Sequence, residues 1–454
     1  MKVRLHGFIR DLPPGPTSFP HLSVDMGLRL RDNPLGTLMG YYEEYGPVFT
    51  LRFLGLEMVF LIGVEANQML LVSDYRDFSW EHGLLGELIP FIGHGLLTTD
   101  DEAHDRARKL LAPAFYPARI KSYGERMVER AQAAIDALTV GDEVEIHGWT
   151  REVAIQIAGD VLLGMSTSEH RAAFFAEHFE QGLSYYGGYI WQTLLMRGPG
   201  SAHSRMRKHI DQLDKVIEEE INHRRRWPPG NHRAILDLLV HAEGDDGERL
   251  SHKEIRDQIF TLLFAGHDTT AATVAWLLAL IGRSPSTYRK LQDEIDDRLG
   301  DRPPEIDDLF GGMPYLDQVI KETLRLYPPA WLGPRMSRKD FQIYGHEVPA
   351  QTNVAYCSWL THRLPEIYED PEAFYPERFT DEAFRALPPG AYVPFGRGPR
   401  TCIGARFGEM EIKILVSLLM QHFRLELMPG QQFPVRTVPT ISPREGVRLK
   451  LRPR

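Results

Sequence analysis

PFGRGPRTCIG, residues 394–404, surrounds one of the two cysteines of the chain with glycines and arginines. Glycine adopts backbone conformations that other residues avoid, and it lets the chain approach a bound group closely. The residues from Cys402 to about Gln421 have a helical pattern, so we expect this cysteine at a helix N-terminus. Backbone N–H groups and the helix dipole favour a thiolate at such a place. The stretch therefore predicts an anionic sulfur beside a closely approachable backbone.

The rest of the chain predicts a mainly α protein with a minor β portion. Helical periodicity fills most of residues 64–330, and the helix expected at 251–282 begins with the capping-box spacing of Ser251 and Glu254. At a rise of ~1.5 Å per residue it would be roughly 45 Å long and cross the whole domain. With no long linker and no repeat, we expect one large domain over residues 1–454. Further elements are expected as helices at 34–45, 119–138, 149–163 and 204–226, a hairpin at 48–62, and strands at 341–349, 352–358, 423–428 and 447–452.

Charge and cysteine content exclude several classes of function. A net charge of −10 makes nucleic acid an unsuitable partner, since phosphate binding requires a cationic face. Two cysteines are too few for an extracellular disulfide framework. The apolar stretch 259–281 is interrupted by His267 and Asp268, which a lipid-exposed helix would resist. We therefore expect a soluble, cytoplasmic protein without a transmembrane anchor.

The cysteine stretch resembles the haem-binding loop of the cytochrome P-450 family, whose pattern is Phe-x-x-Gly-x-Arg-x-Cys-x-Gly. All fixed positions of this pattern are matched, by Phe395, Gly398, Arg400, Cys402 and Gly404. The resemblance implies that Cys402 is the proximal thiolate on the iron of haem b (iron protoporphyrin), with Phe395, Arg400 and Gly404 also at the cofactor. An axial thiolate pushes electron density towards the iron and favours O–O cleavage. Cys357 matches no motif and is expected to be a buried strand residue.

The motif AGHDTT, residues 265–270, places polar side chains in the middle of the long helix. Taken alone, it is typical of a solvated face or of a satisfied buried cluster, because polar groups in an apolar helix require partners. It also resembles the oxygen-binding segment of the same family. On that resemblance, Thr269 would hold the iron-bound oxygen by a hydrogen bond, and Asp268 would help to deliver protons.

Charged residues elsewhere match the family at two further places. KETLRLYPP and FYPERF resemble its buried triad, which gives Glu322, Arg325 and Arg378 a structural role. Taken alone, such pairs are most often weak surface ion pairs. The haem propionates are expected to be held by His104, Arg108, Arg335 and Arg400, although His104 and Arg108 alone could equally mark an exposed basic helix.

The segments that the family uses for substrate contact are apolar in this chain. They include Phe91, Phe264, Ala265, Trp331 and Leu332, with residues 438–441 as a further candidate and residues 183–195 as an aromatic lid. Aromatic residues at helical spacing are more often core than pocket. A lipophilic small molecule is the substrate class that this lining predicts.

The family resemblance predicts a monooxygenase that inserts one oxygen atom from O2, with NAD(P)H acting indirectly through a ferredoxin or flavodoxin and its reductase. Five basic residues and no acid lie between Arg106 and Lys121, which would suit an acidic partner or simply form a solvated face. A peroxide-driven peroxygenase or isomerase is the first alternative, and the intact Asp268–Thr269 pair argues against it. A non-catalytic haem sensor is the second, and it would need no proton relay.

Overall fold

The computed structural model describes residues 12–16, 24–53, 56–164, 169–183, 185, 200–227, 234–243, 247 and 249–454. The chain divides into two compact units. Unit 1 contains residues 1–87, 322–402 and 434–437, and unit 2 contains residues 88–321, 403–433 and 438–454.

Unit 1 is built on a five-stranded sheet in the order β1-β2-β8-β5-β3. Its strands are β1 (Val48–Phe53), β2 (Leu56–Leu61), β3 (Phe78–Ser79), β5 (Leu332–Ser337) and β8 (Asn353–Cys357). β1 and β2 form the predicted antiparallel hairpin, with Val48 opposite Leu61. β2 runs parallel to β8, whose residues Val354 and Tyr356 join a buried apolar cluster with Val48 and Leu61. The alternation of strand residues between the two faces of a sheet explains this one-sided core.

Short elements surround this sheet and form the rest of unit 1. They are α1 (Val24–Asp32), α2 (Pro34–Tyr45), α3 (Val64–Gln68), η1 (Met69–Ser73), η2 (Tyr75–Asp77), α16 (Ser358–Thr361), η6 (Pro376–Phe379), α17 (Asp381–Ala386), η7 (Gly398–Arg400) and the hairpin β6 (Phe341–Ile343) with β7 (His346–Val348). α15 (Pro314–Leu326) begins in unit 2 and ends in unit 1. The helix predicted at residues 34–45 is α2, begun by Asn33 as N-cap and ended at Gly46, whose φ is 82°.

Unit 2 is mainly helical. Its larger helices are α5 (Asp101–Leu111), α6 (Pro117–Asp136), α7 (Ile146–Leu163), α8 (Glu169–Leu183), α10 (Ala202–Arg226), α11 (Ile235–His241), α12 (His252–Gly282), α13 (Pro285–Leu299) and α18 (Ala405–His422), and its shorter ones include α4 (Ile89–Ile92) and α14 (Ile306–Leu309). A small antiparallel sheet has the order β4-β12-β9, formed by β4 (Glu143–Glu145), β12 (Arg448–Arg452) and β9 (Arg424–Leu427). The mainly α fold with a minor β portion is thus confirmed.

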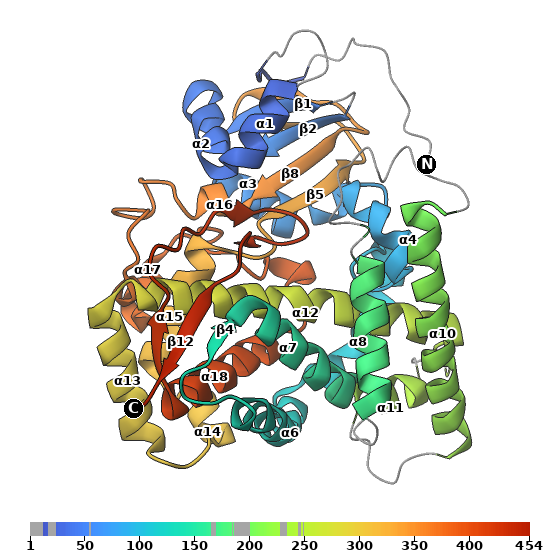
Figure 1. Cartoon of the computed structure of the whole chain (residues 1–454). Coiled ribbons are helices and arrows are strands. Elements are labelled where there is room, and N and C mark those ends of the chain that lie inside the picture. Colours follow the sequence, from blue (N-terminus) through green and yellow to red (C-terminus); the bar gives the residue numbers. More distant parts are fainter. Residues whose placement is uncertain are drawn as a thin grey trace. The chain divides into compact units, whose positions relative to one another are not determined.

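α12 is the predicted long helix, and it packs along α7 and against α18 (Figure 1). Its capping box is present, with the Glu254 N–H donating to Ser251 Oγ at 3.2 Å and the Ser251 N–H donating to Glu254 Oε2 at 2.8 Å. Among the described residues, α12 alone is long and apolar enough to cross a membrane, and 72% of its most apolar window is buried within the protein. It is therefore typical of a core helix.

Two expectations are wrong. The strand expected at residues 341–349 is the hairpin of β6 and β7, because the chain turns at Tyr344 and Gly345, which both have a positive φ. The helix predicted to begin at Cys402 begins at Ala405, with Gly404 as its N-cap. The reason is a loop closure: the Cys402 N–H donates to the Phe395 carbonyl at 2.8 Å, which holds the cysteine in a turn before the helix. Cys402 thus precedes the first turn of α18 in the chain and is not part of it.

Candidate active site

The cysteine loop in unit 1 presents an accessible thiol. Cys402 is exposed, whereas the other thiol, Cys357, is buried at the end of β8, and burial raises the pKa of Cys357 to about 12. Gly398 has a φ of 69°, and a Cβ atom at this position would lie 2.3 Å from the carbonyl oxygen of Leu71. The loop therefore requires glycine at residue 398, and it leaves Cys402 as the thiol that is available for ligation.

Two of the predicted propionate ligands are brought together in unit 1. The Arg335 guanidinium carbon lies 3.2 Å from the ring centroid of Trp80, and that of Arg400 lies 5.0 Å from the same centroid. Arg335 is fully buried, and its Nη1 donates to the Pro334 carbonyl at 2.8 Å. Two cations around one aromatic ring repel each other, so an anionic group bound beside them would be stabilised.

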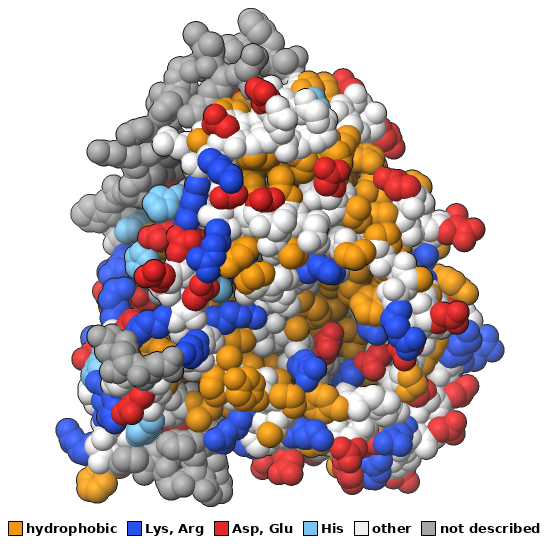
Figure 2. Space-filling model, turned by 180° about the vertical axis from the view of Figure 1, so that it is seen from behind, with side chains coloured by type: hydrophobic (Ala, Val, Ile, Leu, Met, Phe, Trp, Pro, Cys, Tyr) orange, Lys and Arg blue, Asp and Glu red, His pale blue; other side chains and the backbone are white. Residues whose placement is uncertain are grey.

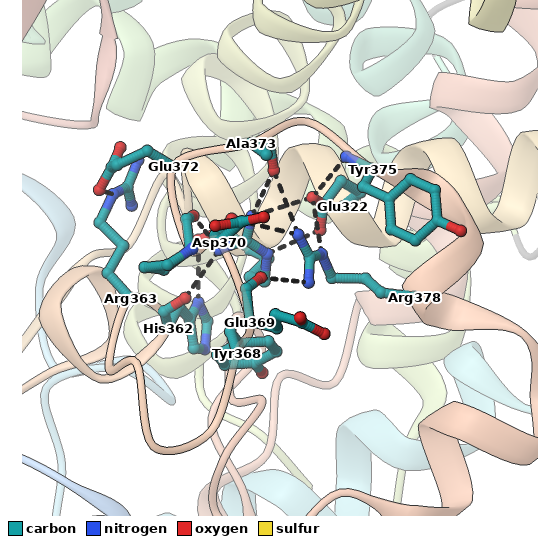
Figure 3. Close-up of polar contacts among 12 residues, drawn as sticks. Glu322, His362, Arg363, Tyr368, Glu369, Asp370, Glu372, Ala373, Tyr375 and Arg378 are labelled. Carbon is teal, nitrogen blue, oxygen red and sulfur yellow. Dashed lines mark hydrogen bonds and ion pairs between the residues drawn. The ribbon is translucent and has the colours of Figure 1, made fainter.

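The predicted triad is also assembled in unit 1. Arg325 donates to the Glu322 carboxylate through Nε at 2.7 Å and Nη2 at 2.9 Å, and Arg378 donates to it through Nε at 3.0 Å. Both Glu322 and Arg325 are completely buried. The remaining Arg325 N–H groups bond to backbone carbonyls, including those of His362 and Ala373, so the cations tie several loops to α15 (Figure 3). This arrangement supports the structural role expected from the sequence.

In unit 2, Thr269 lies on a stretch of α12 that is partly exposed. Its hydroxyl donates to the Ala265 carbonyl at 2.6 Å, the backward bond by which threonine bends a helix. Ala265 and Gly266 are exposed, and a Cβ atom at Gly266 would meet no other atom within 4 Å. The middle of α12 therefore leaves space beside the Thr269 hydroxyl.

Asp268 lies in a buried polar network instead. Successive helix residues point about 100° apart, so the acid and the alcohol leave α12 in different directions. The Asp268 carboxylate accepts a hydrogen bond from the Thr440 hydroxyl, and its Oδ1 lies 3.5 Å from Arg151 Nε and 3.6 Å from His147 Nε2. Thr440 belongs to the segment 438–441, which the sequence suggested for substrate contact. Its described contact is to Asp268.

The network continues to α8 through Arg151. Arg151 Nη2 lies 3.5 Å from Oε1 of Glu180, and His267 Nε2 lies 3.5 Å from the same oxygen. A hydrogen bond with His267, followed by the attraction of Arg151, holds the pKa of Glu180 below its usual range despite partial burial. Because the Glu180 side chain is 39% exposed, it connects the buried Asp268 to the surface of unit 2.

His104 and Arg108 lie one turn apart on α5. His104 is buried, and its Nδ1 lies 3.1 Å from Oδ1 of Asp105, which orients the ring. Arg108 is half-buried. The pair presents an imidazole and a guanidinium to the same side of the helix, which is the donor set that a carboxylate would need.

The cysteine loop, the triad and the acid–alcohol pair agree with a comparison over almost the full length of the chain. The family model for cytochrome P-450 matches residues 13–450. The chain belongs to the cytochrome P-450 family. It is therefore an oxidoreductase, in general terms a haem-thiolate monooxygenase that binds haem iron.

Individual relatives agree with this membership. Human cytochrome P-450 4V2 is 31% identical over 449 residues, covering 92% of this chain and 85% of the relative. Cyclooctatin synthase of Streptomyces melanosporofaciens is 30% identical over 363 residues, covering 78% of this chain and 77% of the relative. The structure of retinoic acid-bound cyanobacterial CYP120A1 is similar with a TM-score of 0.85 and 29% identity, covering 98% of this chain and all (100%) of that one.

The residues of this cytochrome P-450 fit the haem group that its family carries. A haem needs one axial ligand and cationic partners for two propionates. The exposed Cys402 thiol meets the first need, and the guanidinium groups of Arg335 and Arg400 around Trp80 meet the second. Phe395 is half-buried two residues after Val393, and Gly404 caps α18.

The basic segment of this cytochrome P-450 is less cationic than its sequence suggests. Arg106 Nη1 donates to Oε1 of Glu254 at 2.5 Å, and Lys121 Nζ lies 3.6 Å from Oδ1 of Asp307. Both acids are distant in sequence. On the face shown in Figure 2, basic and acidic side chains are interspersed, mainly towards the edges of the view. Two of the five basic side chains are thus paired with acids. Fewer than five net positive charges are therefore available to attract an acidic partner.

The expected pocket residues occupy different environments. Phe91 is fully buried, with its ring centroid 5.5 Å from that of Phe179 and 6.0 Å from that of Phe260, so it is part of an aromatic cluster. Phe264 is half-buried. Trp331 is half-buried and donates its indole N–H to the Thr437 carbonyl at 2.9 Å, while Leu332 opens β5. Of the expected lid at residues 183–195, only residues 183 and 185 are described.

Sequence reasoning missed Trp80 and the partners of Asp268. Trp80 belongs to no motif, and Arg151 and Glu180 resemble ordinary charged residues on helical surfaces. Only the positions of these residues in the fold reveal their partners.

Glu411 is a further residue that the sequence did not indicate. It lies on α18, is 3% exposed, and accepts a hydrogen bond from the Thr270 hydroxyl at 3.4 Å. Within the described part of the chain, its Oε1 has no hydrogen-bond partner. Burial raises the pKa of Glu411 to about 8, so the folded protein holds this carboxyl group in its protonated form at neutral pH.

This raised pKa predicts a pH-dependent stability. Between pH 4.5 and 8, folded Glu411 keeps a proton that the unfolded chain has released, so its contribution to the free energy of unfolding falls by about 1.4 kcal/mol per pH unit as pH rises. Glu411→Gln is expected to remove this slope, as seen by denaturant unfolding at pH 5, 6.5 and 8. The exposed Glu382→Gln is the matched control, and equal slopes in the wild type and Glu411→Gln would contradict the prediction.

Proposed function

We propose that this cytochrome P-450 inserts one oxygen atom from O2 into a lipophilic small molecule, with electrons supplied by a separate ferredoxin or flavodoxin and its reductase. The other oxygen atom leaves as water, and two electrons and two protons are consumed. Haem b bound by Cys402 supplies the O2 chemistry, and the thiolate increases the electron density at its iron. Since the family model spans both units, we propose that they form a single cytochrome P-450 domain.

The chain supplies a ligand and cationic partners for this cofactor. Cys402 would be the axial ligand, and Arg335, Arg400, His104 and Arg108 would bind the propionates. Phe395 and Gly404 would lie against the porphyrin. The buried triad of Glu322 with Arg325 and Arg378 would brace the cysteine loop and take no part in the chemistry.

The observation that carries the proposal is the difference between the surroundings of Thr269 and those of Asp268. The Thr269 hydroxyl faces open space and is bonded only to a carbonyl of its own helix among its described contacts, so it can rotate and donate to a bound oxygen species. Asp268 is buried among Thr440, His147 and Arg151, where it can pass a proton inward. A protein that uses peroxide as its oxidant, or one that only senses a ligand, needs no such proton supply.

The proposed substrate class rests on the apolar character of the residues expected to contact the substrate. Phe264 and Ala265 lie on the same stretch of α12, and Trp331 and Leu332 are half-buried in unit 1. The similar structure of CYP120A1 holds retinoic acid, which is a lipophilic molecule. The two cysteines of the chain are too few for an extracellular disulfide framework and suit a reducing compartment. We therefore propose a lipophilic substrate and a soluble, cytoplasmic protein.

Replacing Thr269 with alanine tests this function. The holoenzyme is first titrated with retinoic acid and other lipophilic molecules, and a ligand that shifts the Soret band is then supplied with ferredoxin, reductase and NADPH. Thr269→Ala is expected to keep consuming NADPH while forming at least about tenfold less product per NADPH. Asp268→Asn is expected to lower turnover about 100-fold, the lower end of what a general acid contributes.

Thr273→Ala is the matched control, because Thr273 makes the same backward bond one turn later, to the Thr269 carbonyl at 2.8 Å. It is expected to leave the coupling of NADPH to product unchanged. Undiminished coupling in Thr269→Ala would falsify the assigned role. Equal product formation from hydrogen peroxide without the reductase would favour the peroxygenase alternative.

A further inference from the structure

His362 links the buried triad to the segment that leads into the cysteine loop, and all of these residues belong to unit 1. It follows α16, is completely buried, and lies beside the triad in Figure 3. Its ring stacks on Tyr392, with ring centroids 5.4 Å apart and an angle of 21° between the planes. Neither the cysteine motif nor the triad motif of the sequence includes it.

Both ring nitrogens of His362 bond to backbone groups, which fixes the proton. Nε2 lies 2.9 Å from the Val393 N–H, and a backbone N–H can only donate, so Nε2 must accept. Nδ1 lies 3.2 Å from the Arg325 carbonyl, which can only accept, so Nδ1 must donate. A flipped ring would place carbon atoms at both contacts and lose both bonds. His362 is therefore neutral, with its proton on Nδ1.

The surroundings favour this neutral form. Burial, together with the nearby cations Arg325 and Arg363, lowers the pKa of His362 to about 3. The two hydrogen bonds therefore persist at neutral pH. Arg325 also returns a bond, since its Nη1 donates to the His362 carbonyl at 2.9 Å.

A continuous set of bonds leads from the triad to the cysteine through His362. The Glu322 carboxylate fixes Arg325, and Arg325 and His362 exchange two bonds. His362 then holds the N–H of Val393, whose carbonyl accepts from the Gly396 N–H at 3.1 Å. Two residues beyond Val393, the Phe395 carbonyl accepts from the Cys402 N–H, which closes the loop.

We propose that His362 is a positioning residue. Through its Nε2 acceptor, it fixes the position and orientation of the loop that carries the Cys402 sulfur. The inference rests on the proposed role of Cys402 as thiolate ligand. The reason is geometric: without the acceptor, the Val393 N–H is buried and unsatisfied, and the loop start must shift to find a partner. The sulfur is attached to this loop and moves with it.

A pair of substitutions separates the two ring nitrogens. Glutamine can place an amide oxygen where Nε2 lies, so His362→Gln retains the acceptor for Val393 and loses the bond to Arg325. Asparagine can place its amide nitrogen where Nδ1 lies, so His362→Asn retains the bond to Arg325 and loses the acceptor. A purely structural role would make the two variants equally defective.

The readouts are the thiolate-type absorption band of the ferrous–carbon monoxide complex and the rate at which haem leaves the purified holoprotein for an acceptor protein. His362→Asn is expected to lose more than half of the thiolate band and to release haem about tenfold faster. His362→Gln is expected to resemble the wild type in both. Far-ultraviolet circular dichroism confirms that each variant is folded.

The outcomes distinguish this inference from the proposed function. A wild-type protein without the thiolate band would overturn the role of Cys402 and the inference with it. A normal wild-type band together with equal behaviour of the two variants, or with a folded His362→Gln that loses the band, would overturn the role of His362 alone. If His362→Asn does not fold, the result for His362→Gln still decides.

Discussion

Replacement of Cys402 by serine is expected to abolish both turnover and the thiolate-type band of the ferrous–carbon monoxide complex. A serine hydroxyl is a far weaker ligand and electron donor than a thiolate, so the electron density needed for O–O cleavage is lost. The Cys402 backbone bond to Phe395 does not involve the side chain, so the loop is expected to keep its conformation. Absorption spectra of the reduced protein with carbon monoxide measure the effect directly.

The only other cysteine of the chain provides the control. Cys357 is buried in β8, and Cys357→Ala removes a thiol without touching the loop. This variant is expected to keep the thiolate band and most of the turnover. A thiolate band that survives in Cys402→Ser but disappears in Cys357→Ala would show that the ligand has been assigned to the wrong cysteine.

The second large effect is expected at Glu322. Glu322→Gln leaves the Arg325 and Arg378 guanidinium groups without their carboxylate, and Arg325 is completely buried. Removing one partner from a buried ion pair costs about 3–5 kcal/mol, because the remaining charge is uncompensated. Denaturant unfolding is expected to show a loss of this size, together with a low yield of protein that contains haem.

Glu57→Gln is the matched control for this experiment. Glu57 also binds an arginine, Arg52, at 3.2 Å, but the side chains of Arg52 and Glu57 are 32% and 38% exposed. Ion pairs that water reaches contribute at most about 1 kcal/mol, so this variant is expected to be nearly as stable as the wild type. A loss at Glu322 no larger than that at Glu57 would show that the triad does not brace unit 1.

Local patterns predicted the elements of the fold well. The capping box of Ser251 and Glu254 marked the start of α12, and Pro34 with Gly46 marked both ends of α2. These signals are local, because each depends on residues within one or two turns. The start of α18 was misplaced because the bond between Cys402 and Phe395 spans a loop, and helical periodicity carries no information about it.

Long-range partners could not be predicted in the same way. Asp268 was found from its motif, but its partner Thr440 lies 172 residues further along the chain. Arg335 and Arg400 were both predicted, and yet Trp80, the ring that they share, was not. His362 carries no signal in the sequence because its role depends on two backbone groups, and backbone groups are the same in every residue.

The sharing of Arg151 between two carboxylates has a thermodynamic consequence. Arg151 lies 3.5 Å from both Asp268 on α12 and Glu180 on α8. The two carboxylates therefore attract the same guanidinium group, and each affects its position. A ligand that displaces α8 therefore changes the charge balance at Asp268. By reciprocity, the protonation of Asp268 changes the free energy of that displacement by an equal amount. A substrate that moved α8 on binding would therefore be coupled to the proton supply at Asp268.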